Sequence, residues 1–376
     1  MGDFFQNIAY FCERITALEA RAAQASPSEM KFRFNEILAR YQRESGLSTP
    51  AEYDFFSVFD YVRPIHTELC LVRFEPDRVR LSFHEDWHGH YSVTAMVRRS
   101  ACILHLIERM RRQGAGEGAA FMCELGDNGE FPSLSFSSRH DRACPVPDPD
   151  FFESHGYEVL RHEIDTHFIP WEAREAKAFW RGSSTGLRRF APPPEGTPEG
   201  EDDFSWLSRL SLCAKARHSP HRAFYDVGLT AIVHMPEPHL VARINRADFL
   251  RPPVPRLDFM RHKGIIVIDG HANAWSALFA ALLMGSCVLK VCSERGYRQW
   301  YYDYLRPFEH YVPIAADLSD LDEALAWLLA HDAKARAIGE AGRDLARAIT
   351  FEAAMDESAA RILRWLPKAR FWEARA

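Results

Sequence analysis

Apolar and polar positions form their clearest pattern between residues 264 and 330. Short β-branched or apolar runs alternate there with longer segments whose apolar positions recur at helical spacing. The predicted elements are strands over 264–269, 287–291 and 311–314 and helices over 272–284, 297–305 and 319–330. Strands that alternate with helices in this way predict a parallel, doubly wound sheet.

The first part of the chain has a different pattern. Residues 67–74 and 78–83 alternate apolar with polar positions around a Glu75-Pro76-Asp77 turn, which predicts a hairpin. A helix over 92–112 follows, ended by a glycine-rich turn, and then a strand over 119–125. A further short strand is predicted over 176–180. We therefore expect an α/β protein with two units.

The expected units are an N-terminal α/β domain over 1–170 and a nucleotide-binding domain over 171–350. A C-terminal helix over 351–376 is expected to pack back on the first domain. The chain has 376 residues, which suits two domains of ordinary size. With 26% charged and 47% hydrophobic residues, its composition is that of a folded globular protein.

Charge and cysteine content narrow both the class of protein and the cellular compartment that the chain suits. The net charge of −6 argues against a general nucleic-acid binder, which usually has a basic face. Residues 1–20 resemble no secretory leader, and the longest uncharged run of the C-terminal half, 270–289, is interrupted by polar residues and a Gly-Ser pair. None of the eight cysteines forms a C-x-x-C pair. We expect a reduced, cytoplasmic protein.

The candidate catalytic and ligand-binding residues lie in the loops after the strands, because ligands of parallel sheets bind beyond the carboxyl ends of the strands. Asp127 follows the 119–125 strand, where its carboxylate could accept a proton from a hydroxyl group. Asp-Asn-Gly is equally typical of a plain turn.

The loop after the 176–180 strand combines arginines with small and hydroxyl residues. It contains Arg181, Gly182, Ser183, Arg188 and Arg189. Backbone N–H groups and hydroxyls can surround phosphate oxygens, and arginine can bind them with two hydrogen bonds. A plain Gly-Ser connection is the alternative.

A third loop connects the 264–269 strand to the next predicted helix. It consists of His271, Ala272, Asn273, Ala274, Trp275 and Ser276. Free N–H groups at the helix N-terminus, expected at 271–273, could stabilise a diphosphate. Alternatively, Asn273 only caps the helix.

Metal binding is weakly indicated. The triplets Asp148-Pro149-Asp150 and Asp320-Leu321-Asp322 match D-x-D, but one lies in a proline-rich turn and the other in a helix first turn. His88 and His90 have no obvious third ligand. We expect no metal site.

Several segments in order resemble glycosyltransferase family 90, which includes Rumi-type protein O-glucosyltransferases, capsule-associated proteins and bacterial lipopolysaccharide-modifying enzymes. The resemblance covers roughly 92–349. Its most specific parts are Phe179-Trp180-Arg181-Gly182-Ser183, Ile268-Asp269-Gly270 with Trp275-Ser276, Gly285-Ser286-Cys287-Val288-Leu289-Lys290 and Pro307-Phe308-Glu309-His310-Tyr311-Val312-Pro313.

The resemblance implies a GT-B fold of two Rossmann-like domains facing a cleft, inversion at the anomeric carbon and no metal. It implies that Asp127 is the general base and that Ser183 and an arginine, either Arg189 or Arg188, contact the donor. Residues 271–276 match a donor-binding stretch, and Lys290 is included among the donor contacts.

The expected function is transfer of a sugar from a nucleotide diphosphate donor, a UDP-sugar, to a hydroxyl of a lipopolysaccharide, capsule or other surface-glycan precursor. A lipid-linked acceptor would bring the protein to the inner face of the membrane. The alternatives are a D-x-D metal-dependent transferase and a catalytically silent nucleotide- or glycan-binding protein. A Rossmann oxidoreductase is disfavoured, because no G-x-G-x-x-G follows a strand.

Overall fold

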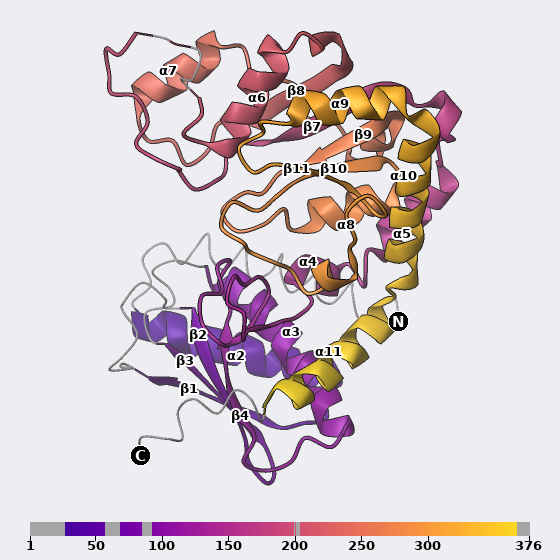
Figure 1. Ribbon diagram of the computed structural model, residues 1–376. Coiled ribbons are helices and arrows are strands. Elements are labelled where there is room, and N and C mark those ends of the chain that lie inside the picture. The colour runs from indigo at the N-terminus through magenta and orange to yellow at the C-terminus, as the bar shows by residue number, and fades with distance from the viewer. Residues whose placement is uncertain (1–26, 57–67, 85–91, 199, 201–203, 367–376) are drawn as a thin grey trace. The chain divides into compact units, whose positions relative to one another are not determined.

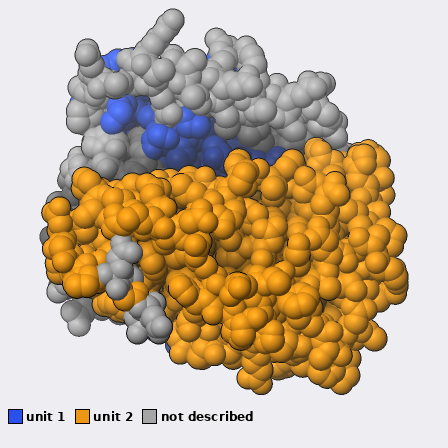
Figure 2. Space-filling view, turned by 90° about the horizontal axis from the view of Figure 1, so that it is seen from above, with its two compact units in different colours: residues 1–156, 297–300, 350–376 blue, residues 157–296, 301–349 orange. Residues whose placement is uncertain are grey.

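The computed structural model describes residues 27–56, 68–84, 92–198, 200 and 204–366 (Figure 1). The chain divides into two compact units, coloured separately in Figure 2. Unit 1 comprises residues 1–156, 297–300 and 350–376, and unit 2 comprises 157–296 and 301–349. The chain therefore returns to unit 1 twice after leaving it.

Unit 1 combines helices with a six-stranded sheet. Its helices are α2 (Pro27–Glu44), α3 (Val93–Arg112), α4 (Pro149–Glu153) and α11 (Phe351–Trp365). Its strands are β1 (Ala51–Phe56), β2 (Leu69–Phe74), β3 (Val79–His84), β4 (Ala120–Glu124), β5 (Leu134–Ser135) and β6 (Cys144–Pro145). The predicted hairpin, helix and following strand are all present, with Ser92 as the N-cap of α3.

The sheet of unit 1 is mixed. Its order is β1-β3-β2-β4-β5-β6, in which β2 runs antiparallel to both β3 and β4 and the other pairs are parallel. The short turn between β2 and β3 allows only antiparallel pairing, since a parallel pair needs a long crossover. The α/β class is as expected, but this unit departs from a fully parallel doubly wound sheet.

Unit 2 has a five-stranded sheet in which every pair is parallel, in the order β11-β10-β9-β7-β8. The strands are β7 (Glu175–Ser183), β8 (Tyr225–Ala231), β9 (His262–Val267), β10 (Cys287–Val291) and β11 (Val312–Ile314). This is the parallel, Rossmann-like sheet that the alternating pattern predicted. Its core includes Ile266, Leu289 and Ile314, which are almost completely buried.

The helices of unit 2 are α5 (Glu158–Thr166), α6 (Ser208–His218), α7 (Pro238–Arg246), α8 (Ser276–Leu283), α9 (Leu321–Ala330) and α10 (Asp332–Ala348). Of these, α6, α8, α9 and α10 contact strands of the sheet (Figure 1). Short 3-10 turns are η2 (Trp171–Ala173), η3 (Arg222–Phe224), η4 (Arg256–Arg261) and η5 (Tyr302–Tyr304). The chain turns away after α8 at Gly285, whose φ of 68° suits a residue without a side chain.

The unit boundary differs from the one expected near residue 170. It falls at Gly156, because α5 packs against α8 and η4 of unit 2 and Arg161 donates to the carbonyls of Ala346 and Ile349. The C-terminal helix α11 belongs to unit 1, where it contacts α3.

The predicted helix over 297–305 is wrong. Residues 297–300 belong to unit 1, where Tyr297 donates to Glu130 and Gln299 to Asp148, and only the turn η5 follows. Tertiary contacts of these polar groups replace the helical hydrogen bonds that the aromatic spacing suggested.

Within the described ranges, we find no helix with the length and apolar character needed to span a membrane.

Candidate functional site

The sheet of unit 2 has a point where its strand order reverses. From β7 the chain forms β8 on one side and then returns to form β9, β10 and β11 on the other. In open parallel sheets, ligands bind outside the carboxyl ends of the strands at this point. A ligand site is therefore expected at the loops that leave β7 and β9.

Arg209 of α6 joins these two loops. Its guanidinium donates to the Ser183 carbonyl at 3.1 Å and to the Thr185 hydroxyl at 2.5 Å, both after β7. It also donates to the carbonyls of Ile268 and Asp269 after β9, at 3.3 and 3.1 Å. One side chain thus fixes the spacing of the two loops.

The charged groups beneath the loops, Arg209 and Asp269, are partly buried. Burial lowers the pKa of Arg209 to about 10, while Asp269 and Cys213 act in the opposite direction. Burial also raises the pKa of Asp269, against the charge of Lys290, a hydrogen bond from Ser293 and the charge of Arg209. Asp269 therefore lies close enough to Lys290 and Arg209 for their positive charges to favour its ionised form, although burial opposes ionisation.

A pocket opens at the ends of β9 and β10. Its lining comprises Leu187, Ser208, Ile268, Asp269, Gly270, His271, Ala272, Cys292, Ser293, Glu294, Arg295 and Ala316. It includes His271 and Ala272 of the predicted donor loop and the segment after β10. Gly270 is confined, because a Cβ there would lie 3.2 Å from Nη2 of Arg209 and 3.4 Å from the Thr185 hydroxyl.

The two candidate arginines, Arg188 and Arg189, have different surroundings. Arg189 Nε donates to Oε2 of Glu294 at 2.7 Å and its Nη2 to the Ala316 carbonyl at 2.5 Å, and both partners line the pocket. Arg188 instead forms two 2.7 Å hydrogen bonds with Glu237. Of the two, Arg189 is the one beside the pocket.

The predicted helix start at 271–273 is wrong, because α8 begins at Ser276. Oδ1 of Asn273 accepts from the Trp275 N–H at 2.5 Å, so Asn273 closes a turn before the helix and is not its N-cap. Trp275 has φ 44° and ψ −130°, which is incompatible with a helical residue. The helix N-terminus therefore lies beyond the pocket-lining residues of this loop.

The remaining residues of the loop do not line the pocket. Ala274 is buried and its carbonyl accepts from Ala277 N–H. The Ser276 hydroxyl accepts from Arg256 at 3.2 Å.

Three other predicted donor residues also have structural partners. Arg181 pairs with Asp226 at 2.5 Å, and Gly182 lies where a Cβ would meet the Trp180 ring at 2.7 Å. Lys290 is buried, with Nζ 5.0 Å from the centre of the Tyr302 ring. None of the three lines the pocket, although Lys290 acts on Asp269.

Asp127 lies in unit 1, in the bend after β4. Its Oδ1 accepts from Nη2 of Arg99 at 2.6 Å, and Arg99 also donates to the Leu125 carbonyl. About a third of the Asp127 side chain is exposed. An arginine thus orients a solvent-accessible carboxylate at a strand end.

Both D-x-D triplets have structural roles. Asp148 caps α4 by accepting from Phe151 N–H, and burial together with Asp150 raises its pKa to about 7. Asp322 accepts from the hydroxyls of Ser219 and Tyr225 at 2.6 and 2.9 Å. In the part of the chain that the structure describes, no three His, Cys, Asp or Glu side chains are grouped to hold a metal ion. His88 and His90 lie outside that part.

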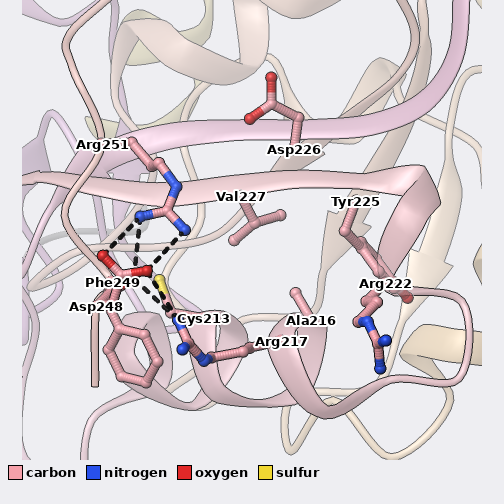
Figure 3. Close-up of a pocket in the computed structure, with 10 residues that line it drawn as sticks. All are labelled: Cys213, Ala216, Arg217, Arg222, Tyr225, Asp226, Val227, Asp248, Phe249 and Arg251. Carbon is pink, nitrogen blue, oxygen red and sulfur yellow. Dashed lines mark hydrogen bonds and ion pairs between the residues drawn. The ribbon is translucent and has the colours of Figure 1, made fainter. Parts of the chain in front are cut away.

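A second pocket lies beside β8 and is drawn in Figure 3. Arg217 and Arg251 both point at Asp248, at 3.1 and 3.3 Å. The pocket includes Tyr225, the first residue of β8, and so reaches the edge of the sheet away from the carboxyl ends of the strands. It contains none of the residues singled out from the sequence.

Sequence reasoning missed Arg209 and Glu294. Arg209 lies in a helix without clear amphipathic spacing, so no local pattern distinguishes it. Glu294 does carry a signal, since it is an acidic residue shortly after a β-strand of a βαβ unit.

Part of the chain is similar to a known protein family. Residues 242–356 match the model for Glycosyl transferase family 90. The chain is 29% identical over 229 residues to Protein O-glucosyltransferase 2 of Danio rerio, covering 57% of this chain and 39% of that protein. It is 38% identical over 140 residues to Protein O-glucosyltransferase 3 of Rattus norvegicus, covering 37% and 25%.

The chain is also similar in sequence to a viral protein and aligns weakly with a solved structure. The uncharacterized protein 035R of Invertebrate iridescent virus 3 is 31% identical over 183 residues, covering 45% of this chain and 14% of that protein. A crystal structure of Anabaena Alr3699/HepE in complex with UDP-glucose aligns with a TM-score of 0.33 at 11% identity, over 74% of this chain and 69% of that one.

The chain thus spans well under half the length of these curated relatives. Its similarity to glycosyltransferase family 90 rests on residues 242–356, which match the family model, and on these relatives.

Proposed function

We propose that this chain is a glycosyltransferase that moves a sugar from a nucleotide diphosphate donor, a UDP-sugar, to a hydroxyl group. The observation that carries the proposal is the pocket at the strand-order reversal, in a chain whose residues 242–356 match the family 90 model. Relatives named protein O-glucosyltransferases support sugar transfer as the reaction class.

The proposed donor site combines charge with close backbone approach. Arg189 would supply the positive charge for the diphosphate, because it lies beside the pocket and its contacts with Glu294 and Ala316 use only Nε and Nη2. The backbone of His271 and Ala272, with the Ser183 loop held by Arg209, would surround the phosphate oxygens. Arginine charge of this kind would stabilise a leaving diphosphate without a metal ion.

The proposed reaction is a single displacement with inversion. The acceptor oxygen attacks the anomeric carbon and forms the new C–O bond, while the bond from that carbon to the diphosphate oxygen breaks. The diphosphate leaves with the electron pair, and Asp127 takes the acceptor proton as general base. Arg99 would hold the carboxylate in one orientation for that transfer.

The proposed acceptor is a hydroxyl of a surface-glycan precursor, as in lipopolysaccharide or capsule assembly. A lipid-linked precursor would bring the protein into peripheral contact with the inner face of the membrane. A protein hydroxyl is the other acceptor class, because the named relatives glycosylate proteins.

The test is calorimetric titration of the wild type and Asp127→Asn with nucleotide diphosphates and UDP-sugars, with and without EDTA, followed by turnover assays. We expect one nucleotide to bind both proteins equally and independently of EDTA, and only the wild type to turn over. Asp141→Asn, at a carboxylate that is 89% exposed, is the matched control.

Other outcomes separate the alternatives. Absence of nucleotide binding would contradict the donor site. Binding lost in EDTA would favour a metal-dependent transferase, and binding without turnover by the wild type, over a panel of acceptors, would favour a silent nucleotide-binding protein. Unimpaired turnover by Asp127→Asn would exclude Asp127 as the base.

A further inference from the structure

Glu294 is the one carboxylate of the pocket lining that is open to solvent, with 45% of its side chain exposed in the described structure. Its Oε2 accepts from Arg189 Nε at 2.7 Å and from the Ser208 hydroxyl at 3.5 Å. Among the described residues, no donor reaches its Oε1. The carboxylate is thus held through Oε2, and its Oε1 is available to accept a hydrogen bond from a ligand.

Glu294 lies at a position in the fold where nucleotide-binding proteins often carry an acidic residue. β9, the 268–275 loop, α8 and β10 form one βαβ unit, and Glu294 follows its second strand. The first loop of the unit and Glu294 line the same pocket. In dinucleotide-binding βαβ units, an acidic residue about 20 residues beyond the glycine-rich phosphate loop hydrogen-bonds the ribose. The 268–275 loop lacks that glycine pattern, so only the position of Glu294 corresponds.

The charge of Glu294 decides which part of a nucleotide it can meet. A carboxylate only accepts hydrogen bonds and would repel a diphosphate, whereas the two hydroxyls of ribose are uncharged donors. Arg189 offsets the negative charge and holds the side chain at the pocket. A neutral diol is therefore the ligand group that suits Oε1 best.

We propose that Glu294 binds the ribose hydroxyls of the nucleotide donor, positioned by Arg189. This inference rests on the proposed function, because it assumes a nucleotide in the pocket. It assigns Arg189 two tasks, since the same guanidinium holds the ribose acceptor and faces the diphosphate. It also makes the site selective for ribonucleotides.

The test compares binding of UDP and 2′,3′-dideoxy-UDP to the wild type, Glu294→Ala and Glu294→Gln. Hydrogen bonds to a charged group are strong, so we expect Glu294→Ala to weaken UDP binding roughly tenfold or more. The dideoxy nucleotide should bind the wild type correspondingly more weakly and be insensitive to the substitution. Glu294→Gln, which keeps an acceptor oxygen, should fall between them.

Glu340→Ala is the matched control, because Glu340 accepts from Arg336 Nε at 2.8 Å on the exposed face of α10. It removes a similar ion pair of unit 2 outside the pocket and should leave both affinities unchanged. Thermal unfolding of each variant checks that it folds. If Glu294→Ala does not fold, the Glu294→Gln series decides the question.

Equal effects of Glu294→Ala on UDP and the dideoxy nucleotide would overturn the inference, because the loss would then come from Arg189 and the diphosphate. An effect on UDP-sugars without one on UDP would overturn it too, by placing Glu294 at the transferred sugar. A wild type that binds no nucleotide would instead overturn the proposed function, so the two failures are distinguishable.

Discussion

At the scale of single residues, Arg209 determines the geometry of the candidate site. Its guanidinium serves four acceptors on two loops, and a planar fork with fixed donor directions suits that task. Lysine could reach only part of this set, because its donors radiate from one atom. Arg209 is therefore a positioning residue for the loops and not a ligand contact.

Arg209→Lys should separate loop geometry from net charge. We expect a loss of about 2–3 kcal/mol in the free energy of unfolding, since buried carbonyls lose their donors. Nucleotide affinity should fall as the loops lose their spacing. Urea denaturation and calorimetric titration measure the two effects.

Arg336→Lys, in an exposed ion pair, is the control for Arg209→Lys and should change neither quantity. If Arg209→Lys retained full stability and affinity, Arg209 would not organise the site.

At the scale of elements, α3 anchors the segment before β1 through Glu108. This buried carboxylate accepts from the Ser48 hydroxyl at 2.5 Å and from the N–H and hydroxyl of Thr49 at 2.9 and 2.6 Å. Burial raises the pKa of Glu108, but these hydrogen bonds and Arg112 lower it more, to about 2. The ionised form is the one that stabilises the fold.

The sign of the pH dependence follows from this shift. The folded pKa lies below that of an unfolded glutamate, so the stabilisation is complete above about pH 4.5 and is lost as the pH falls towards 2. Glu108→Gln should cost about 1–2 kcal/mol near neutral pH. The difference from the wild type should shrink below about pH 4.5.

Denaturant titrations between pH 3 and 7 would measure the effect of Glu108→Gln. Glu117→Gln, at an exposed turn position, provides a variant without such contacts. A difference that stays constant with pH would contradict ionisation of Glu108 as the source of the stability.

At the scale of the whole molecule, the fold couples distant parts of the chain within each unit. Helix α11 comes after all of unit 2 in sequence, yet it belongs to unit 1. Arg109 of α3 pairs with Glu352 and Asp356, and Met355 is buried. The predicted donor contacts, in contrast, all lie in unit 2.

Met355→Ala should therefore destabilise unit 1 by about 2–4 kcal/mol, as expected for a large-to-small change in a core. Calorimetry should show an earlier unfolding transition for unit 1. UDP at about 100 times its Kd should still stabilise unit 2 by about 2.7 kcal/mol.

Arg364→Ala on the exposed face of α11 should leave both transitions in place. Loss of UDP stabilisation in Met355→Ala would contradict the assignment of the donor contacts to unit 2.

Elements with a strong local period were predictable from the sequence alone. The strand 287–291, helix α3 and the parallel sheet of unit 2 were all predictable, because alternating β-branched runs and helical spacing reflect burial within one short segment. The sequence also indicated which loops follow the strands, and hence the Gly182 and His271 loops as candidate sites.

Which side chains meet at those loops depends on the three-dimensional fold. Arg188 and Arg189 are equivalent in sequence, and their different partners, Glu237 and Glu294, come from distant segments. Arg209, the helix start at Ser276 and the contacts of residues 297–300 likewise depend on groups that lie far apart in sequence. Local periodicity records the burial of a segment, whereas a site depends on which segments the fold brings together.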